Sequence, residues 1–515
     1  MSGMPLHTKC APKPLFPLHA ATVACVLGAL AVIAALVQLA LGVDPVVLAI
    51  VAASTGLGLF GFLALGAYNL GAWVVLLYTL GNVMVAMYAK TALGQPLDSH
   101  LDAPELSFLV LLVCIGAMLV ALLLARRLPI GRPLFVATGD LRFLAYLSWV
   151  CFGLGAVFWL LNRWLLEQED GGFGGLALFR DLLVMAVIAR TALLLLRGGC
   201  RWNLDVSLVL MMAAALLMGF LDNQKTAAAL PVVGHFLTVL FSRRGLPWRS
   251  VTLLVAGAIV FVALLAPVIH ALRAMGQQQL DLGQRVEFVV QHLMQLAANP
   301  ARLNEFGELA AQQFERGYYD YFGGEGKGQM LLGRFVSVQQ IDPVIAEVGH
   351  SRPQGGDAVW PALARLAPGF LLPGKPEFIE AYHTLVHYRL IDPQGGKFPT
   401  LPLAGQSYAA YGWVGVALIP LFTFLAFFLA IRKLGWSLYR NVYAIFFLCS
   451  FVLIYVNQGD FGQYAGAVLR NFPLFAIVFW LIQLSYRLCF SKRTPAAPSH
   501  APGRNLTLHR QSSIS

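Results

Sequence analysis

The chain has few charged side chains: Asp, Glu, Lys and Arg make up only 12% of its 515 residues, about half of their usual share in soluble domains. Hydrophobic residues make up 58%, and the mean hydropathy is +0.71. A soluble globule of this size would lack the polar side chains that its surface needs, and a disordered chain would be far less apolar. The composition excludes both classes and predicts a multi-pass membrane protein.

The sequence also lacks the patterns of metal and nucleotide sites. No C-x-x-C or H-E-x-x-H pattern occurs, so a metal site is not indicated, and we expect no cofactor. The glycine-rich stretch 323–328 lacks the P-loop spacing and its Ser/Thr. The net charge of +11 suits the cytoplasmic ends of membrane spans better than a nucleic-acid surface, so no nucleic-acid partner is expected.

A helix needs about 20 apolar residues to cross the hydrocarbon core. Twelve stretches are apolar enough to be predicted as spans, the first of them as a retained helix rather than a cleaved signal. They cover residues 19–42, 45–66, 69–89, 105–125, 141–161, 173–194, 204–221, 226–242, 250–271, 406–430, 441–457 and 466–487.

The basic residues at the ends of these spans predict the orientation. With twelve spans, six basic segments fall on one side, which is typical of the cytoplasm. They contain Lys9, Lys13, Arg126, Arg127, Arg132, Arg197, Arg201, Arg243, Arg244, Arg249, Arg432, Lys433, Arg440, Lys492 and Arg493. Both termini are therefore predicted to be cytoplasmic, and acidic residues such as Asp98 and Glu167 fall outside.

This reading divides the chain into four parts. Residues 1–271 form an N-terminal membrane bundle with nine spans, and residues 406–490 add three more. Between them, residues 272–405 form one large outer loop, which is predicted to contain short helices, as the spacing of apolar residues in 304–322 indicates. All seven cysteines lie outside this loop, which excludes a disulfide framework there. Residues 491–515 are predicted to be a disordered cytoplasmic tail.

Ionisable residues within spans are functional candidates. Arg180 and Asp181 lie in the outer half of the sixth span, 173–194. They have either a functional role or a structural one, as ion pairs with neighbouring helices. Arg190, near the inner end of that span, is expected to extend toward the interface. His235 and His270 are expected to be core histidines.

Basic residues on the outer side oppose the orientation bias, which makes Lys225 and Arg470 candidates for binding an anion. The outer loop adds Arg285, Arg316 and Arg334. Together they suit a lipid-linked phosphate or pyrophosphate, because arginine binds such groups with two parallel hydrogen bonds.

Carboxylates and aromatic residues are combined in the stretch 315–322 of the outer loop. Glu315 or Asp320 could accept the proton of an attacking sugar hydroxyl, and Tyr318 and Tyr319 could position the sugar. The structural alternatives are an Arg316–Asp320 pair on a helix and tyrosines at the membrane interface.

Five local segments occur in a characteristic order: Asp222 to Thr226, Gly333-Arg334-Phe335 with 340–345, the Pro-rich 367–376, the span entry 398–415, and 469–472 around Arg470. In this order they resemble segments of the Wzy-type oligosaccharide repeat-unit polymerases of bacterial O-antigen and exopolysaccharide assembly. The resemblance covers roughly residues 220–475, and the sequence departs from the family pattern at Gly369, at Gln406 and in having no R-x(10)-G pattern in the loop.

The resemblance implies a GT-C-like membrane glycosyltransferase in the bacterial inner membrane. The implied reaction is metal-independent glycosyl transfer between undecaprenyl-pyrophosphate-linked oligosaccharides at the periplasmic face, with a chain-length regulator and a flippase of the same pathway as possible partners. The alternatives are an O-antigen ligase, a polysaccharide flippase or other transporter, and an assembly partner in an envelope complex. A flippase is disfavoured because charge is concentrated on the outer side and in one loop.

Overall fold

The computed structural model describes most of the apolar helices and part of the outer loop. The described residues are 16–17, 19–167, 176–198, 204–222, 224–243, 245–246, ten single residues between 252 and 299, then 321–322, 336–366, 380–391 and 400–490.

The described chain is helical apart from one pair of two-residue strands. Its first half contains β1 (Phe16–Pro17), α1 (Ala20–Ala40), α2 (Pro45–Leu65), α3 (Leu70–Thr79), η1 (Leu80–Met84), α4 (Val85–Ala92), α5 (Pro104–Arg127), α6 (Leu141–Glu167), η2 (Leu176–Asp181), α7 (Leu182–Arg197), α8 (Val206–Leu221), α9 (Lys225–Arg243) and β2 (Gly245–Leu246). The strands β1 and β2 pair antiparallel.

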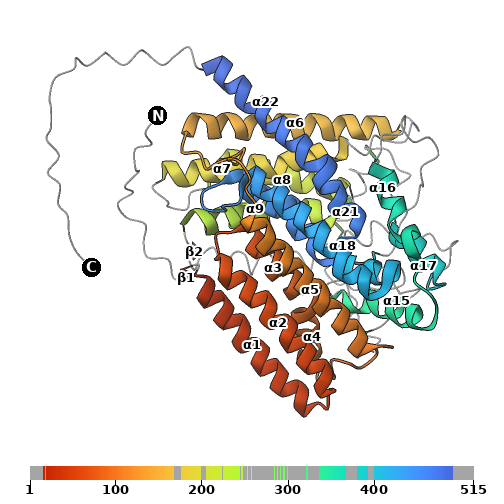
Figure 1. Ribbon diagram of the computed structural model, residues 1–515. Coiled ribbons are helices and arrows are strands. Elements are labelled where there is room, and N and C mark those ends of the chain that lie inside the picture. The colour runs from red at the N-terminus through yellow and green to blue at the C-terminus, as the bar shows by residue number, and fades with distance from the viewer. Residues whose placement is uncertain are drawn as a thin grey trace, which may run out of the picture.

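The described second half contains three short α-helices and one 3-10 helix from the predicted outer loop, followed by the C-terminal membrane helices. The elements are α15 (Val338–His350), η5 (Gly355–Ala358), α16 (Trp360–Leu366), α17 (Glu380–His387), α18 (Leu403–Gly435), α19 (Val442–Phe447), η6 (Leu448–Val452), α20 (Leu453–Gln458), α21 (Phe461–Gly466), η7 (Ala467–Asn471) and α22 (Phe472–Phe490). Figure 1 shows α15, α16 and α17 gathered at one end of the bundle.

Seven of the described helices are long and apolar enough to cross a membrane. They are Ala20–Ala40, Pro45–Leu65, Leu70–Ala92, Pro104–Arg127, Leu141–Leu165, Leu403–Gly435 and Phe461–Phe490. Three predicted spans correspond to shorter apolar helices, Val206–Leu221, Thr226–Ser242 and Val442–Val456. The predicted span 173–194 is divided between η2 and α7, and 250–271 lies outside the described residues apart from two isolated positions. A multi-pass α-helical membrane protein is thus supported, while the count of twelve stays a prediction.

The long helix α5 lies against α18, and a distant charged side chain caps each of its ends. At its start, Asp342 of α15 accepts hydrogen bonds from the backbone N–H of Asp102 (2.6 Å) and of Ala103 (3.1 Å) and from Ser107 Oγ (2.7 Å). At its end, Arg432 of α18 donates to the carbonyl of Leu128 (2.7 Å). An anion at the N-terminus and a cation at the C-terminus complement the helix dipole.

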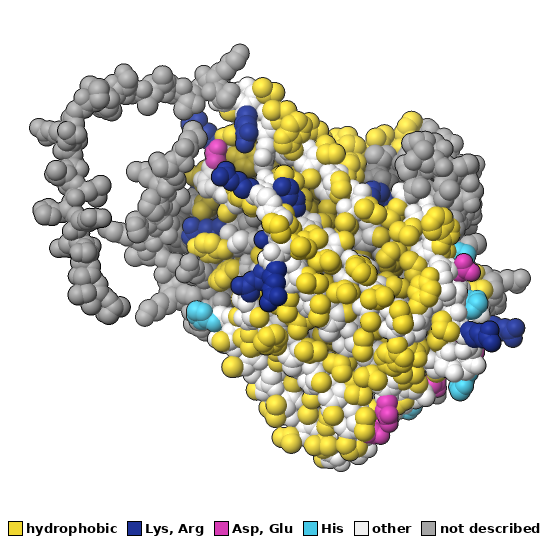
Figure 2. All heavy atoms as spheres, viewed as in Figure 1, with side chains coloured by type: hydrophobic (Ala, Val, Ile, Leu, Met, Phe, Trp, Pro, Cys, Tyr) yellow, Lys and Arg dark blue, Asp and Glu magenta, His cyan; other side chains and the backbone are white. Residues whose placement is uncertain are grey.

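Long-range contacts join helix ends that the sequence assigns to the same side of the membrane. At the end that carries Arg432, the Leu70 N–H donates to the Trp436 carbonyl at 2.9 Å. At the opposite end, the Asp44 N–H donates to Asp98 Oδ2 at 2.8 Å. Figure 2 shows a broad hydrophobic surface with most Lys and Arg toward one end and most Asp and Glu toward the other, near α15–α17. This arrangement agrees with the predicted alternation of the spans, and we call the end with α15–α17 the outer end.

The helix α18 consists of two helical segments joined by a kink. Tyr411 (φ −140°) and Gly412 (φ +58°) have non-helical backbone angles, and a positive φ of this kind favours glycine. The segment before the kink is almost completely buried. There Gln406 donates to the Ala358 carbonyl (2.8 Å) and accepts from the Phe461 N–H (2.8 Å), which ties η5 and α21 to α18 at the outer end.

Candidate functional site

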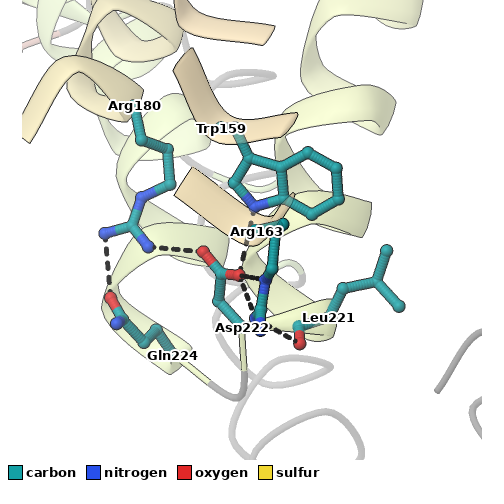
Figure 3. A network of polar contacts seen from close by, with 6 residues as sticks. All are labelled: Trp159, Arg163, Arg180, Leu221, Asp222 and Gln224. Atoms are coloured by element: carbon teal, nitrogen blue, oxygen red, sulfur yellow. Dashed lines mark hydrogen bonds and ion pairs between the residues drawn. The ribbon is translucent and has the colours of Figure 1, made fainter. Parts of the chain in front are cut away.

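A group of polar side chains meets at the outer end of α6, α8 and α9, and we call Trp159, Arg163, Arg180, Asp222 and Gln224 the outer polar cluster (Figure 3). Arg180 Nη1 donates to Asp222 Oδ2 at 2.7 Å, and Arg180 Nη2 donates to Gln224 Oε1 at 2.8 Å. The arginine belongs to η2, whereas its two acceptors belong to the turn between α8 and α9. Two bonds through two different nitrogens fix the plane of the guanidinium.

The second arginine of the cluster comes from α6. Arg163 Nε donates to Asp222 Oδ1 at 3.0 Å, Nη2 forms an ion pair with the same oxygen, and Nη2 also donates to the Leu221 carbonyl at 2.9 Å. Trp159, one helical turn before Arg163, donates its indole N–H to Asp222 Oδ1 at 3.1 Å. Asp222 therefore connects α6, η2 and the end of α8.

The local sequence explains why Asp222 lies at this point. Helix α8 ends at Leu221, and Asp222 is its C-terminal cap residue. A carboxylate is unfavourable beside the negative end of a helix dipole, so it requires the two arginines for compensation. Gly219 allows α9 to approach closely, because a Cβ at Gly219 would lie 2.5 Å from the backbone nitrogen of Ala228. The tight α8–α9 hairpin thus places Asp222 and Gln224 together.

The five residues of the outer polar cluster carry one net positive charge, and the carboxylate of Asp181, which interacts electrostatically with Arg180, lies just outside this group. Two guanidinium groups surround one carboxylate, and the side chains of Arg163, Arg180 and Asp222 are 13%, 18% and 11% exposed. A guanidinium has five N–H donors, and Arg180 uses two bonds within the cluster. In a partly desolvated site the surplus charge interacts more strongly than it would in water. The arrangement is suited to holding an anion such as a phosphate.

A second polar group lies on α20, α21 and η7 at the same end. Arg470 is exposed and its Nε donates to Asn471 Oδ1 (3.1 Å), while Asn471 Nδ2 donates to the Tyr455 hydroxyl (3.4 Å). Asp181, Arg470 and Asp460 all lie within electrostatic range of that hydroxyl. Arg180 and Arg470 both belong to short irregular elements, η2 and the π-helical turn η7.

The structure describes only some of the candidates that the sequence selects. Arg180 lies in the outer polar cluster, where it forms an ion pair with Asp222, as the structural alternative predicts. Arg470 lies near Tyr455. Lys225 begins α9 beside Gln224, with its side chain outside the described part. The remaining candidates lie outside the described residues: Arg285, Glu315, Arg316, Tyr318, Tyr319, Asp320 and Arg334. His270 lies there as well.

Sequence reasoning missed Arg163, Trp159 and the part played by Asp222. Arg163 lies at the predicted outer end of its span, so the argument that selected Lys225 and Arg470 applies to it equally. Trp159 and Arg163 are also four residues apart and therefore share one face of α6. These two signals together could have found the residues of α6 that hold Asp222.

Two other ionisable groups within the bundle have structural partners. His235 Nδ1 lies 2.9 Å from Thr191 Oγ1 in the core between α7 and α9, as expected for a core histidine. Arg190 forms an ion pair with Asp205, which also caps the start of α8 at the Leu208 N–H. Arg190 of α7 is therefore paired with the residue that caps the start of α8.

These observations define an α-helical multi-pass membrane protein with a cationic cluster at one end of its bundle. Within the described part of the chain, no group of three His, Cys, Asp or Glu side chains is arranged to hold a metal ion. No family model matches the sequence, and neither a curated protein nor a solved structure matches it.

Proposed function

We propose that this protein is a metal-independent membrane glycosyltransferase that polymerises undecaprenyl-pyrophosphate-linked oligosaccharide repeat units into O-antigen or exopolysaccharide. The observation that carries the proposal is the outer polar cluster, in which Asp222 holds Arg180 and Arg163 in fixed positions with one positive charge in excess. Lys225 starts the adjacent helix α9, whose N-terminus also favours an anion.

The chemistry of the reaction requires such a cluster. The sugar hydroxyl of one repeat unit attacks the anomeric carbon of the other chain, and the bond from that carbon to the pyrophosphate oxygen breaks. Negative charge develops on the departing lipid pyrophosphate, and fixed guanidinium groups stabilise it without rearrangement. The hydroxyl proton passes to a carboxylate, for which Glu315 and Asp320 are the candidates.

The remaining candidates are assigned by the same logic. Arg285, Arg316, Arg334 and Arg470 are proposed to extend the cationic surface along the pyrophosphate and the sugars, and Tyr318 and Tyr319 to orient the acceptor. The proposed location is the bacterial inner membrane, with both termini in the cytoplasm and the reaction at the periplasmic face in a GT-C-like architecture. A chain-length regulator and a flippase of the same pathway are the proposed partners.

Deleting the gene distinguishes this function from its alternatives. Loss of a polymerase leaves single repeat units that are still exported and, where a ligase exists, still attached to their acceptor. Loss of a ligase leaves long chains on the carrier lipid, and loss of a flippase leaves units on the cytoplasmic side. Electrophoresis of surface glycans and analysis of the carrier lipid should show single units outside; long carrier-bound chains would identify a ligase instead.

Purified protein provides the direct test. It should elongate a lipid-linked repeat unit in the presence of a chelator, because Arg and Lys are proposed to supply the positive charge that a metal supplies in other glycosyltransferases. Activity that a chelator abolishes and a divalent ion restores would contradict the metal-independent mechanism.

A further inference from the structure

Lys90, at the outer end of the third predicted span, is completely buried (0% exposed). Its ammonium donates to the Ser99 carbonyl at 3.1 Å and to Ser99 Oγ at 2.7 Å, and His100 Nδ1 lies 3.4 Å away. All three groups belong to the segment between α4 and α5. A buried lysine ammonium requires this kind of compensation, because desolvating a charge is costly.

An aromatic side chain from the outer loop covers the same ammonium. Lys90 Nζ lies 4.2 Å from the centre of the Tyr321 ring and 5.8 Å from that of Phe322. Both distances are within the range of a cation–π interaction, which is strongest where water is excluded. Tyr321 and Phe322 are themselves fully buried, although they lie more than 200 positions away in the sequence.

Two hydrogen bonds hold this aromatic pair in place. The Tyr321 hydroxyl donates to the Leu97 carbonyl at 2.5 Å, and Gln95 Nε2 donates to the Phe322 carbonyl at 2.6 Å. Burial raises the pKa of the Tyr321 phenol well above its ordinary value, so the hydroxyl retains the proton that it donates. The segment 95–107 also binds Asp342 of α15, so one platform anchors the outer loop at two points.

A lysine is a poor choice for this position if packing alone matters. Methionine has a similar length and would avoid the cost of burying a charge. The ammonium of Lys90 is best explained by its interaction with the Tyr321 ring, which it holds in one orientation. In the sequence, Tyr321 directly follows Asp320, one of the two candidate bases.

We propose that Lys90 is a positioning residue that docks the outer loop, through Tyr321, on the segment between α4 and α5, and that elongation depends on this docking. This inference rests on the proposed function for its catalytic consequence, whereas the docking itself is independent of it. Lys90 acts through Tyr321 and is not assigned a contact with the substrates.

The test uses the purified full-length protein with five variants: Lys90→Met, Lys90→Arg, Tyr321→Phe, Tyr321→Leu and the double variant Lys90→Met/Tyr321→Leu. Hydrogen exchange of the peptide containing Tyr321 reports docking, thermal unfolding reports stability, and elongation of a lipid-linked repeat unit reports activity. Lys433→Met is the control with the same substitution. Lys433 lies in the last turn of α18, at the end of the bundle opposite to Lys90, and its Nζ donates to the Arg132 carbonyl at 3.3 Å.

Lys90→Met and Tyr321→Leu should each speed exchange at this peptide and slow elongation by about tenfold or more, the factor expected for a desolvated cation–π contact. The double variant should add little, because the two residues act through one contact. Lys90→Arg and Tyr321→Phe, which keep the cation and the ring, should retain most of the activity. Lys90→Met should speed exchange at the Tyr321 peptide without speeding exchange elsewhere in the chain, and the control should match the wild type.

Unchanged exchange at the Tyr321 peptide in Lys90→Met would overturn the proposal, and so would additive effects in the double variant. A lower melting temperature with faster exchange throughout the chain would show that Lys90 is only structural. Absence of elongation by the wild-type protein would count against the proposed function, while the exchange data would still decide whether Lys90 docks the loop.

Discussion

Arg180 and Asp222 are 42 residues apart in the sequence, and Arg180 Nη1 lies 2.7 Å from Asp222 Oδ2. The pair joins the short helix η2 to the turn between α8 and α9. Because Asp222 also binds Arg163, its removal leaves two partly buried guanidinium groups without their anion.

Asp222→Ala should therefore lower the free energy of unfolding by about 1–3 kcal/mol, a value below that for a fully buried pair because the side chains are partly exposed. Arg180→Lys keeps the charge but cannot bind both Asp222 and Gln224 in the same geometry, so it should cost less stability and still reduce elongation. Thermal unfolding of the purified protein measures the first effect. Glu105→Gln, an exposed residue at the same end of the bundle, is the control; an equal loss there would show that the effect is not specific to the cluster.

Four other cations are expected to bind the lipid pyrophosphate: Lys225, Arg316, Arg334 and Arg470. Replacing any one of them with alanine should remove long polymer while the protein level stays normal. Loss of one such contact costs on the order of 2–4 kcal/mol, or about a hundredfold in rate. Glycan electrophoresis beside an immunoblot measures both quantities. Normal chain length in all four single variants would contradict the cationic site.

The orientation can be tested with fusions to a reporter that is active only outside the cytoplasm. A fusion near Asp320 should be active and a fusion after Arg493 inactive, because the basic residues at the span ends predict cytoplasmic termini. Activity at both positions or at neither would overturn the orientation.

Asp342 should make stability depend on pH. Burial raises the pKa of its carboxyl above the ordinary value of 3.8, against the lowering effect of its three hydrogen bonds. Just above pH 3.8 the folded protein keeps a proton that the unfolded chain has lost, so the free energy of unfolding falls as the pH rises through the folded pKa. Asp342→Asn removes this titration and one acceptor, at a cost of about 1–3 kcal/mol.

The stability advantage of the wild type over Asp342→Asn should thus be largest at acidic pH and shrink toward neutral pH, as measured by denaturation at a series of pH values. The exposed Asp357 provides the matched Asp→Asn control. An advantage that grows with pH would mean that the hydrogen bonds outweigh burial.

Gly219 should be intolerant of a side chain. A Cβ would lie 2.5 Å and 2.7 Å from the backbone nitrogen and Cα of Ala228, so Gly219→Ala must push α8 and α9 apart, at a cost of about 1–3 kcal/mol. Gly116→Ala in α5 meets nothing within 4 Å and should be neutral or stabilising, since alanine favours helix. In thermal unfolding, Gly219→Ala should lower the melting temperature, and Gly116→Ala should leave it unchanged or raise it; equal melting temperatures of the two variants would mean that the hairpin is less tightly packed.

The sequence by itself determined the class of protein and most of the helices. Long apolar runs such as 105–125 can satisfy their backbone polar groups in lipid only as helices, so their existence follows from composition. Composition does not determine the number of spans where apolar runs are short or interrupted. The run 173–194 is an example, because the structure divides it into η2 and α7 after Asp181. The position of a charge within a span indicated Arg180, and the position of a basic residue on the outer side indicated Arg470.

Only the tertiary structure decided which of these residues meet. Asp222 brings Arg163 and Arg180 together from three parts of the chain, and Lys90 meets Tyr321 across more than 200 residues. Hydrophobic periodicity specifies the face that a helix buries, but it carries no information about the partner of a polar side chain at a helix end. That partner depends on how helices pack and on turns such as the one after Gly219, where a missing Cβ sets the distance between two backbones.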